Sequence, residues 1–179
     1  MSASTRAGRV ADELTLLSGH QRVLRLLVCL TPPAVLGCAL LAGAPFAWWV
    51  LVVVVALGLL CVAAPDSHAV LLTLAFLAWR WLADVADPRT PWVVPAALAV
   101  LVLHTAAAVS AGVPGSAVLD PLIRQRWLRR TAVVALATVG VWGVTAAAGT
   151  LQPAPSAVAT LAAVALVASV AEILRRSGR

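Results

Sequence analysis

Apolar runs long enough to cross a membrane recur along most of this chain, from residue 23 to residue 174. As an α-helix, about 20 consecutive apolar residues span the ~30 Å hydrocarbon core of a bilayer. Hydrophobic residues make up 62% of the sequence and charged residues only 11%, well outside the range of soluble domains. No stretch is long and polar enough for a separate soluble domain. The sequence therefore predicts an all-α integral membrane protein.

Proline, glycine and charged residues divide the apolar sequence into six predicted spans. A mixed segment over residues 1–21 precedes them, and its pattern suits either a short amphipathic helix on the membrane surface or a frayed tail. A single membrane domain then covers residues 22–179, with spans at about 23–43, 46–64, 68–84, 91–112, 131–150 and 156–174. Small residues in the last two spans predict close packing, against each other or against another subunit of a homo-oligomer or a partner protein.

The third predicted span decides the orientation of everything that follows it. If residues 68–84 cross the membrane, both termini and eleven of the 13 arginines lie on one side, leaving only Arg80 and Arg89 near the other. If the segment is re-entrant, the arginine-rich loop over residues 113–130 faces outward. Because basic residues concentrate in cytoplasmic loops, the second arrangement is disfavoured. We therefore predict a six-helix bundle with both the N and the C terminus in the cytoplasm.

The polar segment before the fifth span is predicted to form an interfacial helix. Asp120 followed by Pro121 is typical of a helix start, and Leu122, Ile123 and Trp127 are then predicted to face lipid. The chain is strongly basic, which can indicate nucleic acid, but arginines beside apolar runs more often set topology, so no nucleic-acid partner is predicted. Four arginines are instead predicted to contact anionic lipid headgroups at the cytoplasmic face: Arg124, Arg126, Arg129 and Arg130.

Two features within the predicted spans are typical of a transport path. The pair Pro32-Pro33 near the middle of the first span predicts a kinked or broken helix; such kinks line a path in many transporters and only improve packing in others. His104 lies about 20 Å below the outer face at ~1.5 Å per residue. A histidine at this depth relays protons or binds a substrate group, or else makes one interhelical hydrogen bond, with Thr105 nearby.

Ionisable residues near the two membrane surfaces form the remaining candidates. Arg80 and Asp84 are four residues apart on one predicted helix and are expected to pair. They are interpreted either as an anchor near the outer surface, with Arg80 extending between Trp79 and Trp81, or as a binding site.

Asp66 and His68 form a candidate polar cluster at the cytoplasmic face, where an ion pair with neighbouring arginines is the hypothesis. Cys61 is close to His68 in sequence and depth, but a zinc site needs three or four converging ligands and only Cys29 is placed to join them. No metal or cofactor is therefore predicted. The sequence also contains no nucleophile–base arrangement, phosphate-binding glycine loop or paired carboxylates, so nothing in it argues for an enzyme.

The stretch from residue 65 to residue 105 contains Pro65-Asp66-Ser67-His68, Trp79-Arg80-Trp81-Leu82, Asp87-Pro88, Pro91-Trp92 and His104-Thr105. It resembles uncharacterised multi-pass membrane proteins of actinobacteria, often encoded beside a MoxR-class AAA ATPase and its partner proteins. The resemblance implies a place in the plasma membrane of a bacterium and membership of an envelope-associated assembly, and it carries no activity.

Two functional hypotheses follow from the sequence. The first is a small integral membrane protein that acts as a structural or accessory subunit, because the chain has short outer loops, small-residue faces and no soluble domain. The alternative is a small transporter or channel that uses the Pro32-Pro33 kink and His104.

Overall fold

The computed structural model describes residues 18–64, 68–87, 89–112 and 120–151. All regular structure in these residues is α-helical, which confirms the predicted all-α class. The helices are α2 (Gly19–Leu41), α3 (Trp48–Ala63), α4 (Ala69–Asp84), α5 (Val93–Gly112) and α6 (Pro121–Leu151). The predicted sixth span over residues 156–174, most of the segment 1–21, and Asp66 lie outside the described residues.

Three of these helices are long and apolar enough to cross a membrane: α2, α5 and the part of α6 over Pro121–Ala147. These lengths and this composition indicate a membrane protein. The helices α3 and α4 have 16 residues each, which gives about 24 Å at ~1.5 Å per residue, against a hydrocarbon core of ~30 Å. The segments predicted as the second and third spans are therefore helical but short.

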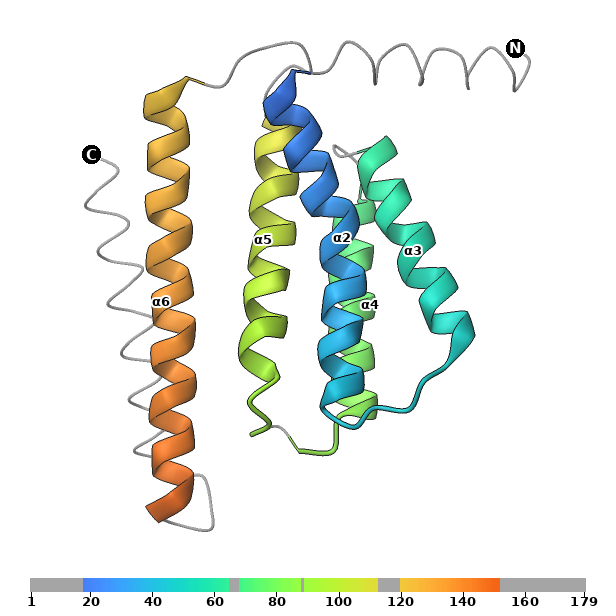
Figure 1. Cartoon of the computed structure of the whole chain (residues 1–179), viewed down its shortest axis with the longest axis vertical. Helices are drawn as coiled ribbons and strands as arrows, with labels where there is room; N and C mark the ends of the chain where they lie inside the picture. The colour runs from blue at the N-terminus through green and yellow to red at the C-terminus, as the bar shows by residue number, and fades with distance from the viewer. Residues whose placement is uncertain (1–17, 65–67, 88, 113–119, 152–179) are drawn as a thin grey trace. The chain divides into compact units, whose positions relative to one another are not determined.

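Contacts divide the chain into two compact units, Met1–Pro121 and Leu122–Arg179, which are described separately. In the first unit, α2 packs most extensively against α5 and then against α3. The helix α4 packs chiefly against α3, and it contacts α2 and α5 over shorter stretches. Each helix from α3 to α5 runs opposite to the one before it (Figure 1). The predicted single membrane domain over residues 22–179 stays a prediction.

The prolines in α2 do not break the helix, which continues through Pro32 and Pro33. Each proline lacks an N–H and so leaves a carbonyl four residues earlier without its usual donor. One of these carbonyls, on Cys29, lies where α3 brings Gly58 close to α2: a Cβ at Gly58 would be 3.4 Å from that oxygen. Figure 1 shows the ribbon of α2 changing direction near its midpoint, as a kink requires.

The interior of the first unit is filled by aliphatic and small side chains. Val28, Val50, Val54 and Leu103 are at most 1% exposed and form its centre. On α5, small buried residues face the neighbouring helices, and small residues let helices approach closely in a membrane. They are Ala96, Ala106, Ala107 and Ser110.

The second unit contains all of α6 except its first residue. This continuous helix of 31 residues begins at Pro121, directly after Asp120, as the sequence predicts. The predicted interfacial helix and the fifth span are therefore a single element of about 46 Å. At about 100° per residue, Arg126 and Arg130 fall on the same side of α6 as Leu122 and Ile123. Leu122 and Ile123 are exposed and Trp127 is half-buried, and the prediction that these three residues face lipid stays a prediction.

Candidate functional site

Arg80 and Asp84 form an ion pair on the last turns of α4, which confirms the predicted i, i+4 pairing. Both side chains are only 14% exposed. The Arg80 guanidinium carbon lies 5.8 Å from the ring centre of Trp79, and 5.4 Å from that of Trp49 at the start of α3. Arg80 thus contacts one of its two neighbouring tryptophans and, in place of Trp81, a tryptophan from another helix.

This cluster joins the beginning of α3 to the end of α4. A guanidinium over an indole face is attracted by the negative potential of the ring, most strongly where water is excluded. Asp84 neutralises the positive charge of Arg80, so the cluster of Arg80, Asp84 and the two tryptophans is compatible with a position near the hydrocarbon boundary. The arrangement therefore has the chemistry of an anchor; whether it also binds a ligand stays a hypothesis.

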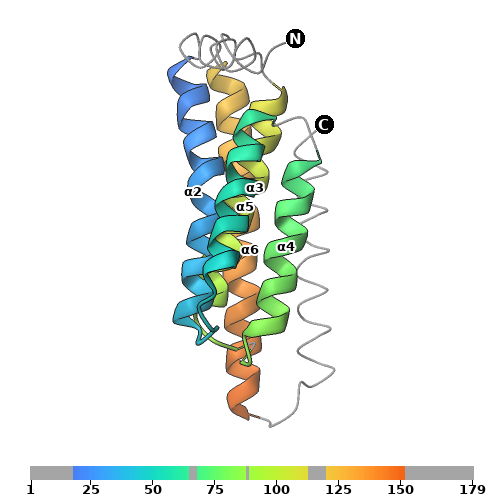
Figure 2. The same cartoon turned by 90° about the vertical axis from the view of Figure 1, so that its right-hand side faces the viewer.

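Five of the chain's seven tryptophans lie at the same end of the first unit, which we call the tryptophan end. Here α2 and α4 finish and α3 and α5 begin, as both views show (Figures 1 and 2). Tryptophans concentrate at membrane–water interfaces because one part of the ring is apolar and the N–H is polar. The five residues are Trp48, Trp49, Trp79, Trp81 and Trp92.

His104 does not face the interior of the first unit. It is exposed on α5, whereas its neighbour Leu103 is fully buried. The Thr105 hydroxyl donates to carbonyls of its own helix, at 2.8 Å to Leu101 and 3.2 Å to Val102. Within the described part of the chain, the His104 side chain makes no hydrogen bond, so the interhelical bond that the sequence suggested is not present there.

Pro32 lies in the opposite environment from His104, since it is among the fully buried side chains. The adjacent Thr31 is 8% exposed and donates its hydroxyl hydrogen to the Leu27 carbonyl at 2.8 Å. The two features proposed for transport are therefore separated: Pro32 is buried in the packed interior, and His104 is exposed on the outer side of α5.

Cys61 and Thr73 connect α3 and α4 inside the first unit. The Cys61 sulfur lies 3.2 Å from the Thr73 hydroxyl oxygen, and both residues are at most 1% exposed. Thr73 gives its single hydroxyl hydrogen to the Ala69 carbonyl at 2.7 Å. The thiol is therefore the donor to Thr73, a contact that was not predicted from the sequence.

The remaining candidates lie at helix ends. His68 precedes α4 and is exposed; its predicted partner Asp66 is outside the described residues, so the inner-face cluster stays a hypothesis. Among the described residues, no group of three or more His, Cys, Asp or Glu side chains could hold a metal ion. The four predicted lipid-contacting arginines of α6 are all exposed: Arg124, Arg126, Arg129 and Arg130.

One buried polar contact was missed from the sequence. The Gln21 amide nitrogen, on the first turn of α2, donates to the Ser110 carbonyl near the end of α5 at 3.4 Å. Gln21 is 2% exposed. In the sequence, Gln21 lies beside Arg22 at the start of a predicted span, where polar residues usually face water. Its burial depends on the packing of α2 on α5, which joins residues far apart in the sequence.

No family model matches this chain, and neither a curated protein nor a solved structure shows a significant similarity to it. Its class is therefore given by the helices themselves, three of which are able to cross a membrane.

Proposed function

We propose that this chain is a multi-pass protein of a bacterial plasma membrane and acts as a structural or accessory subunit of an envelope-associated assembly. The observation that carries the proposal is the closely packed, mainly apolar interior of the first unit. Apart from Gln21, its buried side chains are apolar or small, and the hydroxyl groups of Thr31, Thr73 and Ser110 bond within the unit. A water-filled transport path instead needs polar groups that remain open to solvent.

The exposed surface supports the same proposal. In α6, none of the residues in the most apolar window is buried. Apolar side chains exposed along its length include Leu128, Leu136 and Val144. In a bilayer such a surface contacts lipid or a neighbouring membrane helix, and the small residues of α6 suit close helix packing. An accessory subunit requires a surface of this kind.

For the topology we propose six spans with both termini in the cytoplasm. The support is the distribution of arginines along the sequence. The tryptophan end of the first unit carries Arg80 and Arg89, the two arginines that this topology leaves outside, so it would lie at the outer interface. The arginines of α6 would then contact anionic headgroups at the inner face.

Site-directed cysteine labelling tests this topology. In a variant whose native cysteines Cys29, Cys38 and Cys61 are replaced by alanine, one new cysteine is introduced at a time. We expect the Asp87→Cys variant to react with a membrane-impermeant maleimide in intact cells, and the Ser116→Cys variant to react only after permeabilisation. If both sites react from the outside, the six-span topology is wrong.

The assembly is tested by purification of the full chain in a mild detergent, after crosslinking in native membranes. We expect a stable complex, either with another membrane protein or between copies of this chain. A monomer without any crosslinked partner would contradict the accessory-subunit proposal.

The alternative proposal is a small transporter or channel that uses the Pro32-Pro33 kink and His104. It is less well supported, because one feature is buried and the other exposed. Its test is the His104→Ala variant in reconstituted vesicles. Loss of a proton-coupled or substrate-coupled flux, with folding intact, would favour the transporter; an unchanged flux would remove His104 from any mechanism.

A further inference from the structure

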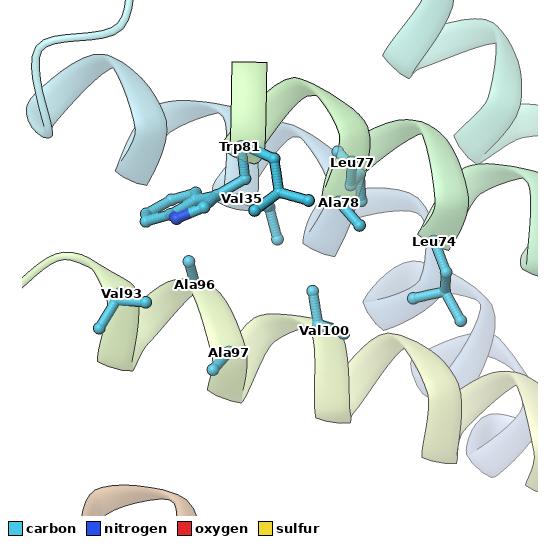
Figure 3. Close-up of a pocket in the computed structure, with 10 residues that line it drawn as sticks. Val35, Leu74, Leu77, Ala78, Trp81, Val93, Ala96, Ala97 and Val100 are labelled. Carbon is cyan, nitrogen blue, oxygen red and sulfur yellow. The ribbon is translucent and has the colours of Figure 1, made fainter. Parts of the chain in front are cut away.

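A groove of about 500 Å³ runs along the first unit between α4 and α5. These two helices contact each other little, although they are consecutive in the chain. Figure 3 shows Leu74, Ala78 and Trp81 on α4 across from Ala96 and Val100 on α5, with Val35 of α2 behind them. The volume falls within the range of ~300–1,000 Å³ that is usual for small-molecule sites.

The lining of this groove is apolar along its whole length. Trp81 supplies the single polar group of the lining side chains, its indole N–H, at the end of the groove next to Val93 (Figure 3). An occupant matched to these walls is therefore a hydrocarbon chain over most of its length. The small side chains of Ala78, Ala96 and Ala97 leave the space for it.

At its Trp81 end the groove adjoins the loop that joins α4 to α5, because Leu82 and Val93 line the groove on either side of this loop. This loop belongs to the tryptophan end and carries Arg89, which is exposed. The Arg89 backbone N–H donates to the Asp87 carboxylate at 2.9 Å, and the Asp84 carboxylate is paired with Arg80.

Arg89 is thus the cation available at this end. In the described part of the chain its guanidinium has no ion pair. A phosphate group is a good partner for an arginine side chain, which offers a planar fork of donors. An occupant that combines a long apolar chain with an adjacent phosphate matches both the apolar walls and Arg89 in the adjoining loop.

Because the walls are apolar and Arg89 lies in the adjoining loop, we propose that the α4–α5 groove holds one acyl chain of a glycerophospholipid, with the lipid phosphate at Arg89. The Trp81 indole N–H then lies at the boundary between chain and headgroup, where tryptophan is usually found. The bound lipid fills the space that α4 and α5 leave between them and so completes the first unit.

The test is native mass spectrometry of the full chain, purified in mild detergent, delipidated and then titrated with phosphatidylglycerol. We expect one tightly bound phospholipid per chain. The Ala78→Phe variant fills the groove and should lose this lipid, whereas the Ala75→Phe variant carries the same change on an exposed part of α4 that does not line the groove, and should keep it.

The Arg89→Gln variant tests the headgroup separately, and we expect phosphatidylglycerol to bind about tenfold more weakly to it. Unchanged affinity in this variant would overturn the assignment of the phosphate to Arg89. Equal retention of lipid by Ala78→Phe and Ala75→Phe, an absence of bound lipid in the wild-type chain, or a second copy of the chain in place of the lipid would overturn the groove site. Far-UV circular dichroism establishes that each variant is folded.

Discussion

The helices α5 and α4 are attached to the first unit in different ways. The helix α5 packs along α2 through buried small residues and Leu103, which is fully buried. By contrast, α4 is linked to α3 by polar groups: Thr73 accepts from the Cys61 thiol, and Arg80 lies over Trp49. Between α4 and α5 lies the apolar groove. Close packing therefore dominates the attachment of α5, whereas polar contacts to α3 add to the attachment of α4 beside its buried Ala69 and Leu77.

The largest effect is expected where packing dominates. Leu103→Ala should lower the free energy of unfolding by about 2–5 kcal/mol, because it leaves a cavity between α5 and its neighbours. Leu72→Ala on α4 makes the same truncation at a residue that is 57% exposed, and should cost far less. Unfolding in mixed micelles with increasing sodium dodecyl sulfate measures both. Equal losses for the two variants would remove the distinction between packed and open surfaces.

The close approach of α2 and α3 gives the next effect. Gly58→Leu should lower the free energy of unfolding by about 1–3 kcal/mol, since its side chain must displace α2 at Cys29 and Pro32. Gly58→Ala is the control: its Cβ would be 3.4 Å from the Cys29 carbonyl oxygen, an ordinary contact. The same unfolding measurement should therefore show little change for alanine. A tolerated leucine would mean that the two helices do not approach closely at the prolines.

At the tryptophan end, Asp84→Asn should lower the free energy of unfolding by about 1 kcal/mol. The change removes the anion that neutralises Arg80, in a position with some access to water. Asp87→Asn is the matched control, because Asp87 is exposed and only accepts a hydrogen bond from the Arg89 backbone. Intrinsic tryptophan fluorescence, to which Trp49 and Trp79 contribute, should report any loosening of the cluster in the first variant. If both variants behave alike, the ion pair adds nothing to the attachment of α4.

The link between α3 and α4 is expected to be weaker. Thr73→Val keeps the shape of the side chain but removes the acceptor for the Cys61 thiol, which should cost about 0.6 kcal/mol in a membrane protein. Thr138→Val on α6 is a control, since Thr138 makes the same kind of bond to its own helix, to the Val134 carbonyl at 2.9 Å. Infrared spectroscopy of the S–H stretch should detect a shift only in the Thr73 variant, and no shift would contradict the assigned donor.

The smallest effect is expected in the groove. Ala78→Leu should change the free energy of unfolding by less than about 0.5 kcal/mol, because Ala78 is exposed and has empty space beside it. Ala106→Leu places the same larger side chain on α5, where the alanine is 4% exposed, and should cost about 1–3 kcal/mol. Thermal unfolding in detergent compares the two. A strongly destabilised Ala78 variant would show that the groove is closed.

Much of the local structure was predictable because it depends on short-range spacing. Helix starts and ends follow proline, glycine and capping residues, as at Asp120-Pro121. The Arg80–Asp84 pair follows from helix geometry, which places residues four apart on one face. The kink at Pro32 and Pro33 has the same local origin, namely two missing N–H donors. Each of these predictions uses residues within one or two turns of each other.

The exposure of His104 and the inward position of Thr73 show where such reasoning stops. Thr73 is the single hydroxyl residue in its apolar run and is spaced four residues from the buried Ala69 and Leu77, which is a weak local signal that it faces inward. No signal near His104 indicates which side of α5 faces α2, since apolar residues surround it on every side. In a helix that is hydrophobic all round, periodicity does not identify the buried face.

The sequence by itself determined that this is an all-helical chain with helices able to cross a membrane, because length and apolar composition decide those properties residue by residue. It also determined the pairing within α4. Only the tertiary structure decided that Arg80 meets Trp49, that the Cys61 thiol donates to Thr73, and that α4 stands apart from α5. These contacts join residues on different helices, and they depend on how side-chain volumes fit together across the whole unit.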